Sequence, residues 1–96
     1  MLTWVLYDIA DDRRRGKAAR ACLRVGLYRV QKSVFLGTLN GSELDELVVR
    51  LEALVDAGRD SVYAFPMCRT DFAKVVLLGR AFDEDLVTDG LRTLLM

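Results

Sequence analysis

The sequence predicts a small α+β domain of the ferredoxin-like type, in which split β-α-β units place two helices on one face of an antiparallel sheet. Three observations predict this fold. The order of segments is β-α-β-α-β-β, where the second β segment is either one bent strand or two short ones. The chain has 96 residues, which is too few for a second core. Its first strand is apolar on both faces, which indicates that both faces of the sheet are covered.

Residues 2–9 are predicted to form the first strand. Its alternating positions are all apolar, with Leu2, Trp4 and Leu6 on one face and Val5, Tyr7 and Ile9 on the other. Two helices cover only one face of a sheet in a chain this small. We therefore expect a second copy of the chain to cover the other face. The hydrophobic content of 52% exceeds the needs of one small core and also favours an oligomer.

A helix is predicted next, with Asp11 or Asp12 as its N-cap and Gly26 after its last turn. Its apolar positions recur with helical spacing, at Ala18, Ala21, Cys22 and Val25. A second row of positions is cationic and is expected to face solvent over about 16 Å of helix. This row, called the basic stripe below, consists of Arg13, Lys17, Arg20 and Arg24.

The middle of the chain predicts more strand and a second helix. Residues 28–39 are rich in β-forming residues and form one bent strand or two strands that reverse near Lys32. Asn40-Gly41 predicts a turn, after which Ser42 caps the second helix with Asp45 three positions later. That helix is expected to end at Gly58. Its apolar positions are Leu44, Leu47, Val48, Leu51, Leu54 and Val55.

The last third of the chain predicts two strands, over residues 61–65, stopped by Pro66, and over residues 74–78. We expect the domain to comprise residues 1–80, and residues 81–96 to be a short helix or a mobile tail. The two cysteines, Cys22 and Cys68, lie far apart without a CxxC motif, so reduced and buried thiols are expected. No segment approaches the roughly 20 apolar residues of a membrane span. These features predict a soluble, cytoplasmic protein without a membrane partner.

The charges are unevenly distributed along the chain, although the formal net charge is zero. From residue 42 onward, eleven acidic residues face six basic ones. Between residues 13 and 41 there is no acidic residue, and the eight basic ones are Arg13, Arg14, Arg15, Lys17, Arg20, Arg24, Arg29 and Lys32. Clusters of Lys and Arg supply most sequence-independent affinity for nucleic acid, so contact with phosphate is predicted here. The alternative is a helix face that is merely solvated.

Asp8 is the candidate catalytic and metal-binding residue. The chain has no histidine, so Ser-His and Cys-His mechanisms are excluded, and an enzyme would have to use carboxylates and a metal. A carboxylate at a strand's end, beside a helix start and the basic stripe, suits a site that holds Mg²⁺ or Mn²⁺ against phosphate. A two-fold dimer would bring both copies of Asp8 together. The alternative is that Asp8 only accepts hydrogen bonds at the strand–helix junction. Tyr7 and Phe35 either stack on bases or pack in the core.

Two segments carry a family resemblance: residues 7–15, YDIADDRRR, and residues 26–37, GLYRVQKSVFLG. They resemble the CRISPR-associated protein 2 family, the smaller of the two universal spacer-acquisition proteins. The match extends more loosely through the second helix, the strand that ends at Pro66 and residues 74–79. Lys17 stands where arginine also occurs in the family, and Lys32 where an aromatic residue is frequent.

The resemblance implies a homodimer in which the strand of residues 74–79 crosses to the partner's sheet. It implies a symmetric Mg²⁺ site built on Asp8 between the two chains, and metal-dependent cleavage of RNA or DNA phosphodiesters. Family members act chiefly as a scaffold, in which a central dimer bridges two dimers of the CRISPR-associated integrase and holds duplex DNA. The residues that correspond to family positions around the site are Tyr7, Arg15, Lys17, Arg29 and Phe35.

Three functions therefore remain open. The first is a CRISPR adaptation protein, a dimeric scaffold for duplex DNA with endonuclease activity. The second is a stand-alone toxin-type ribonuclease of the virulence-associated family, which would act on single-stranded RNA. The third is a ferredoxin-like regulatory domain that binds a small ligand. The basic stripe disfavours the third, because a small-ligand module has no need of it.

Overall fold

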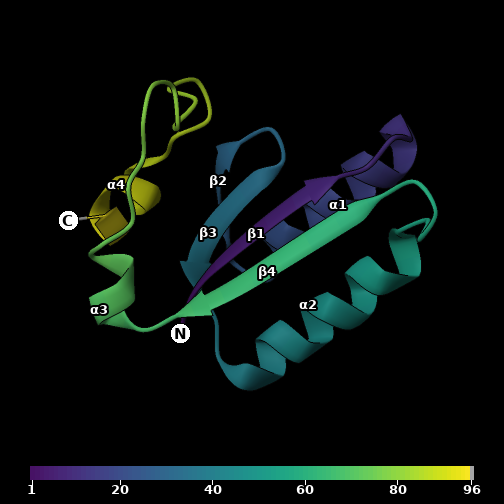
Figure 1. Ribbon diagram of the computed structural model, residues 1–96, viewed down its shortest axis with the longest axis horizontal. Helices are drawn as coiled ribbons and strands as arrows, with labels where there is room; N and C mark the ends of the chain where they lie inside the picture. The colour runs from purple at the N-terminus through teal and green to yellow at the C-terminus, as the bar shows by residue number, and fades with distance from the viewer. Residues whose placement is uncertain (96) are drawn as a thin grey trace.

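In the computed structural model, which describes residues 1–95, two long helices cover one face of a four-stranded antiparallel sheet (Figure 1). The strand order is β2-β3-β1-β4, as the ferredoxin-like prediction requires. Two short helices follow the last strand. The elements are β1 (Leu2–Asp8), α1 (Asp12–Arg24), β2 (Tyr28–Gln31), β3 (Val34–Thr38), α2 (Gly41–Leu54), β4 (Ser61–Met67), α3 (Arg69–Phe72) and α4 (Asp89–Leu95).

Local sequence signals explain where α1 begins and ends. The Asp11 side chain accepts a hydrogen bond from the backbone N–H of Arg14 at 2.9 Å, which caps the first turn. Gly26 follows the helix with a φ of 98°, a conformation that glycine adopts without steric cost. Both ends of this helix were predicted from the sequence.

The ends of α2 differ from the prediction. Asn40, and not Ser42, is the N-cap: its side chain accepts from the Glu43 N–H at 2.8 Å, and Glu43 accepts from the Asn40 N–H at 2.9 Å. This reciprocal pair is a capping box that begins two residues earlier than the expected one. The helix also ends at Leu54 instead of Gly58, because Val55 is already extended.

The strands also refine the prediction. Residues 28–39 form two strands, β2 and β3, and not one bent strand. Strand β4 continues through Pro66 to Met67, although Pro66 was expected to end it. Strand β4 lies at the edge of the sheet, where the missing N–H of proline leaves no ladder bond unmade.

The core lies on both faces of the sheet. On the face that α1 and α2 cover, Val5 and Phe35 pack against buried residues of the two helices, Ala18, Cys22, Leu47 and Leu51. On the opposite face, Trp4 and Leu36 pack against Leu91 of α4. The expectation that only a second copy covers this face is therefore wrong in part, because the C-terminal segment of the same chain covers its β2–β3 half.

Residues 74–79 form no strand within the described chain. Lys74 ends a turn and residues 75–78 have no regular secondary structure; the Val76 and Leu78 side chains there are 75% and 81% exposed. A strand needs a neighbour, and no described strand pairs with this segment. The expected strand at residues 74–78 is thus wrong for the single chain.

The C-terminal residues pack on the domain as a short helix, the first of the two expected alternatives. The Asp83 N–H donates to the Val30 carbonyl at 2.8 Å and the Gln31 amide donates to the Arg80 carbonyl, so this segment covers the outer edge of β2. Residue 96 lies outside the described residues. Cys22 is buried as predicted, whereas Cys68 is exposed. None of the helices described here combines the length and the apolar character needed to cross a membrane.

Candidate nucleic-acid interface and metal-binding carboxylate

Asp8 lies on the face of the sheet that α1 and α2 leave free. Side chains alternate along a strand, so Asp8 shares a face with Trp4 and Leu6. The residues paired with Trp4 and Leu6 across the sheet are Phe65 and Tyr63 of β4. The Asp8 side chain is exposed and makes no hydrogen bond or ion pair with any of residues 1–95. The alternative of a structural Asp8, which requires such partners at the strand–helix junction, is not supported.

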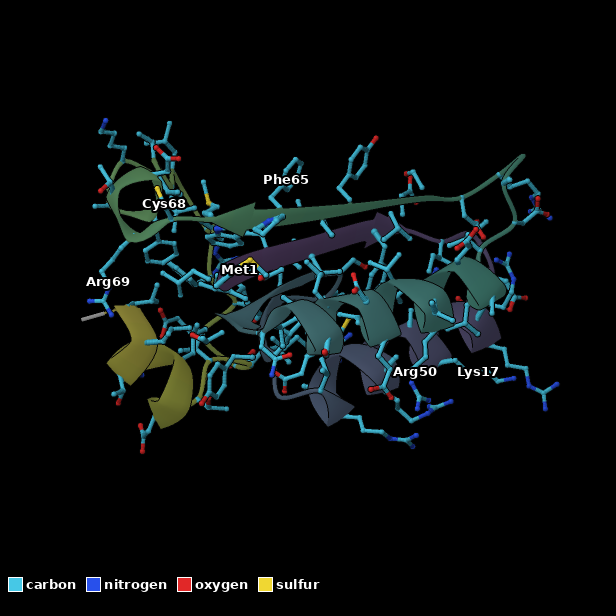
Figure 2. All side chains as sticks on the ribbon, turned by 90° about the horizontal axis from the view of Figure 1, so that it is seen from below. Met1, Lys17, Arg50, Phe65, Cys68 and Arg69 are labelled. Atoms are coloured by element: carbon cyan, nitrogen blue, oxygen red, sulfur yellow. The ribbon has the colours of Figure 1, made fainter. Side chains whose placement is uncertain are left out.

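The free face beside Asp8 is apolar. Tyr63 and Phe65 are 54% and 50% exposed, and their rings stack at 6.2 Å with an interplanar angle of 5°. Figure 2 shows Phe65 projecting from β4 on the side away from the two long helices. Exposed aromatic surface of this kind usually marks a site where another molecule binds.

Asp8 alone does not form a metal site. Within residues 1–95 no three His, Cys, Asp or Glu side chains come together as metal ligands. A Mg²⁺ ion needs only one or two protein carboxylates, because waters and substrate phosphate oxygens complete its shell. An exposed, unpaired carboxylate fits such an ion, provided that a second carboxylate comes from another copy of the chain.

The basic stripe lies on the other side of the sheet from Asp8. Helix α1 packs against the face that carries Val5 and Phe35, and its four stripe residues are exposed. In Figure 2, Lys17 points to the helical side and Phe65 to the opposite side. Within residues 1–95 the structure therefore does not bring Asp8 and the basic stripe together. The two features occupy opposite faces.

Three of the other predicted nucleic-acid contacts have partners within the chain. Arg14 forms an ion pair with Asp60 and donates to the Leu54 carbonyl at 3.1 Å. Arg15 pairs with Asp12 and donates to the Ile9 carbonyl. Arg29 donates to the Lys32 carbonyl at 2.7 Å and lies over the Phe35 ring. By contrast, the four residues of the basic stripe make no ion pair with any residue in the described range.

Tyr7 and Phe35 are core residues. Their rings stack at 5.9 Å on the helical side of the sheet, and both side chains are buried, so neither is available to stack on a base. Burial, supported by the neighbouring Cys22, raises the pKa of Tyr7 to about 12 against the opposing charges of Arg29 and Arg15. Burial likewise raises the pKa of the Cys22 thiol to about 12. Neither group ionises at neutral pH, which excludes both as a general base or nucleophile.

Asp60 holds the start of α1 against the end of α2. Its buried side chain accepts from the backbone N–H of Ala10 at 3.0 Å and of Asp56 at 2.8 Å, in addition to Arg14. The hydrogen bond from Arg14 and the two backbone bonds hold the pKa of Asp60 well below its usual range. Sequence spacing gave no sign of this cluster, because its members lie some 50 positions apart.

We expect Asp60→Asn to destabilise the fold, because the amide removes the charge that pairs with Arg14. A carboxyl whose pKa is lowered by folding stabilises the protein above its unfolded pKa, about 3.9, and this contribution is lost as the pH falls below that value. Thermal unfolding is measured from pH 7 to pH 2.5. The variant should have a lower Tm than the wild type at pH 7, and the difference in Tm between the two proteins should shrink below about pH 4. Asp71→Asn, on exposed α3, is the control. A constant difference at all pH values would contradict this account.

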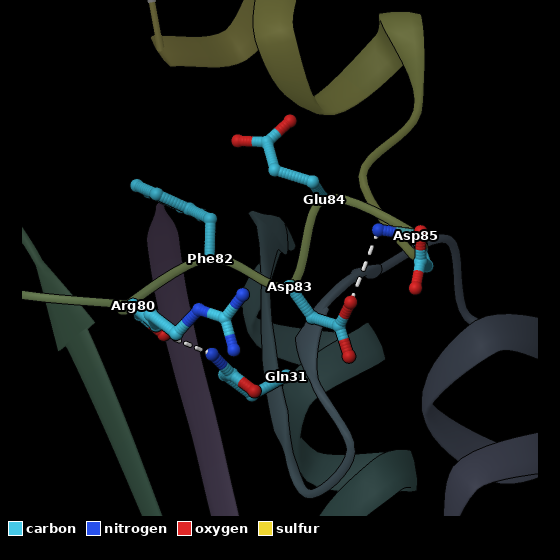
Figure 3. Close-up of a pocket in the computed structure, with 6 residues that line it drawn as sticks. All are labelled: Gln31, Arg80, Phe82, Asp83, Glu84 and Asp85. Carbon is cyan, nitrogen blue, oxygen red and sulfur yellow. Dashed lines mark hydrogen bonds between the residues drawn. The ribbon is translucent and has the colours of Figure 1, made fainter.

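A pocket of about 310 Å³ lies beside the outer edge of β2 (Figure 3). Gln31 and Arg80 line one side of it, and Asp83, Glu84 and Asp85 line the other. The Asp83 carboxylate accepts the Asp85 N–H at 3.0 Å, which shapes this loop. The three carboxylates outnumber the one cation, Arg80, around this cavity, which disfavours phosphate there.

The fold and the surface define a small ferredoxin-like protein with a cationic helical face and an exposed carboxylate on its sheet face. The CRISPR associated protein Cas2 family matches residues 1–75, and the chain belongs to this family. The chain is 38% identical over 79 residues to CRISPR-associated endoribonuclease Cas2 1 of Archaeoglobus fulgidus, a match that covers 82% of this chain and 84% of that relative.

Two solved structures support the same assignment. The chain matches Streptococcus pyogenes Cas2 with a TM-score of 0.70 and 27% identity, over 82% of this chain and all of the other. It matches the Thermus thermophilus protein TT1823 with a TM-score of 0.65 and 40% identity, over 70% of this chain and 80% of the other. The family match ends at residue 75, so most of the C-terminal segment lies beyond it.

Proposed function

We propose that this chain is a CRISPR adaptation protein, a homodimeric scaffold that binds duplex DNA for the spacer integrase and has Mg²⁺-dependent endonuclease activity at Asp8. The observation that carries the proposal is the basic stripe in a chain of the Cas2 family, because its four cations are exposed and free of ion pairs within residues 1–95. Such cations bind phosphates without regard to base sequence.

The apolar surface of the chain supports the dimer. Tyr63 and Phe65 leave an apolar area on the free face, next to Asp8. The two edges of the sheet also differ: residues 80–83 cover β2, whereas no described strand covers β4. A strand of residues 74–79 from a second copy would pair with β4 and shield Val76 and Leu78. The proposed strand exchange thus pairs the open edge strand β4 of one chain with the exposed apolar residues 74–79 of the other.

We expect the double variant Tyr63→Asp, Phe65→Asp to be monomeric at micromolar concentration. Two charges in the centre of an apolar interface remain unpaired on association, which costs several kcal/mol. The control is Val49→Asp, since Val49 is also an exposed apolar residue, 66% exposed, but lies on α2, on the helical side. Sedimentation velocity measures all three proteins. A double variant that remains dimeric, or a control that dissociates, would place the interface elsewhere.

The proposed cleavage places the two copies of Asp8 across the two-fold axis. Their carboxylates would hold a Mg²⁺ or Mn²⁺ ion, which supplies activation of a water at neutral pH and neutralisation of phosphate charge. No histidine exists in the chain, and Tyr7 and Cys22 stay protonated, so neither side chain can take the proton from the water. Relatives named endoribonucleases support cleavage of RNA as the activity of this site.

The scaffold role is tested by reconstitution with a CRISPR-associated integrase. Native mass spectrometry with a short duplex should show one dimer of this chain between two integrase dimers. Absence of any such complex, together with a small antitoxin gene as neighbour and cleavage of single-stranded RNA, would instead establish the toxin-type ribonuclease.

A further inference from the structure

A groove of about 440 Å³ lies between α1 and α2, and cations from both helices line it. Lys17, Arg20 and Arg24 of the basic stripe form one wall, and Arg50 of α2 stands in the other. Figure 2 shows Lys17 and Arg50 together on the side of the helices away from the sheet. The sequence indicated a cationic row on one helix only, whereas the packing of the helices produces a channel with charge on two sides.

Three apolar residues also line the groove: Ala21 of α1, and Ala53 and Leu54 of α2. The two alanines do not extend beyond Cβ, so the long cationic side chains on either side reach further from the helices than the alanines do. A strand of phosphate and sugar can enter between such walls, where a flat helix face would offer contact from one side only.

The charges around the groove fix where phosphate would bind. Among residues 1–95, Arg50 pairs only with Glu46 of its own helix, at 3.1 Å. The two side chains are 48% and 64% exposed, so a phosphate can readily replace Glu46 as the partner of Arg50. Glu43 and Glu46 line an adjoining hollow beyond Arg24. The attractive part of the groove thus runs from Lys17 toward Arg24 and ends at these two acids.

We propose that this groove binds the sugar–phosphate backbone of one strand of duplex DNA, with Arg50 contacting phosphate from the α2 wall opposite the basic stripe. The distance from Lys17 to Arg24, about 10 Å along the helix, corresponds to the axial rise of roughly three phosphates of one strand. The inference rests on the proposed DNA-binding function. It adds Arg50 of α2 as a further phosphate contact and places the bound strand in the groove between the two helices. Because the groove lies on the opposite face of the sheet from Asp8, a strand bound there is held away from the carboxylate of the same chain.

Fluorescence anisotropy with a labelled duplex, titrated at several salt concentrations, tests the proposal in the full-length protein. Arg50→Ala should weaken binding about three- to tenfold. The dependence of log affinity on log salt concentration should also become less steep, by about 0.9 for each occupied groove. Glu46→Gln should tighten binding severalfold, because it frees Arg50 and removes a negative charge. The opposite signs of these two effects distinguish a phosphate contact from damage to α2.

The chain offers matched controls in a second exposed pair, Arg92 with Glu84, which are also 3.1 Å apart. Arg92→Ala and Glu84→Gln make the same charge changes far from the groove and should leave affinity and slope unchanged. If Arg50→Ala binds like the wild type while charge reversal in the basic stripe weakens binding, α1 binds DNA and the groove does not. Equal losses for Arg50→Ala and Arg92→Ala would also overturn the proposal, and absence of duplex binding by the wild type would overturn the proposed function itself.

Discussion

Replacing Asp8 by asparagine is expected to abolish metal-dependent cleavage, with a loss of at least about a hundredfold, because an amide binds Mg²⁺ poorly and the attacking water is then no longer activated. The fold should be preserved, since the Asp8 side chain is exposed and makes no hydrogen bond with residues 1–95. Dimer formation and duplex binding should also persist, because the basic stripe lies on the opposite face of the sheet.

The assay compares purified wild type and Asp8→Asn on RNA and on duplex DNA, with Mg²⁺, with Mn²⁺ and with EDTA. Asp71→Asn controls for the loss of one exposed carboxylate, as it lies on α3. Equal cleavage by wild type and Asp8→Asn, or cleavage that survives EDTA, would assign the activity to a contaminant or another site. Absence of cleavage by the wild type would leave the scaffold as the function of this chain.

Reversing three charges of the basic stripe, with Arg13→Glu, Lys17→Glu and Arg20→Glu, is expected to weaken duplex binding about a hundredfold or more at low salt. Each phosphate contact that is lost lowers the salt slope by about 0.9, so the dependence of affinity on salt should become much flatter. Stability should change little, because these side chains are exposed and make no ion pair with residues 1–95.

A triple variant with the same change in net charge separates a local contact from a general effect of charge. Arg69→Glu, Arg80→Glu and Arg92→Glu reverse three exposed cations of the C-terminal part of the chain, outside residues 74–79 of the proposed strand exchange. This control should weaken binding far less than the stripe variant, because its cations lie outside the helical face. Wild-type affinity and salt slope in the stripe variant would mean that the basic stripe is only a solvated surface.

The sequence predicted those features that depend on near neighbours in the chain. Asp11 and Gly26 mark the ends of α1 because capping and a positive φ involve only adjacent turns. The alternation along residues 2–8 placed Asp8 on the same face as Trp4 and Leu6, since the side-chain period of a strand is two. Tyr7 and Phe35 pack in the core, which is one of the two alternatives that the sequence left open.

The features that the sequence did not predict depend on packing between distant segments. Asp60 and Arg14 meet only because the loop after α2 folds back to the start of α1. Arg50 joins the basic stripe only through the crossing of the two helices. Residues 74–78 have the composition of a strand. A strand must also pair with the free edge of a sheet, and the sequence pattern does not show whether such an edge lies beside this segment.

Sedimentation velocity of the wild-type chain at micromolar concentration, alone and with a short labelled duplex at low salt, tests the account most directly. The account predicts a species of two chains without DNA, and the same two chains sedimenting with one duplex. The duplex should be released as the salt concentration rises, since phosphate contacts hold it. A stable monomer, or a dimer that never sediments with DNA, would contradict the proposal of a dimeric DNA scaffold.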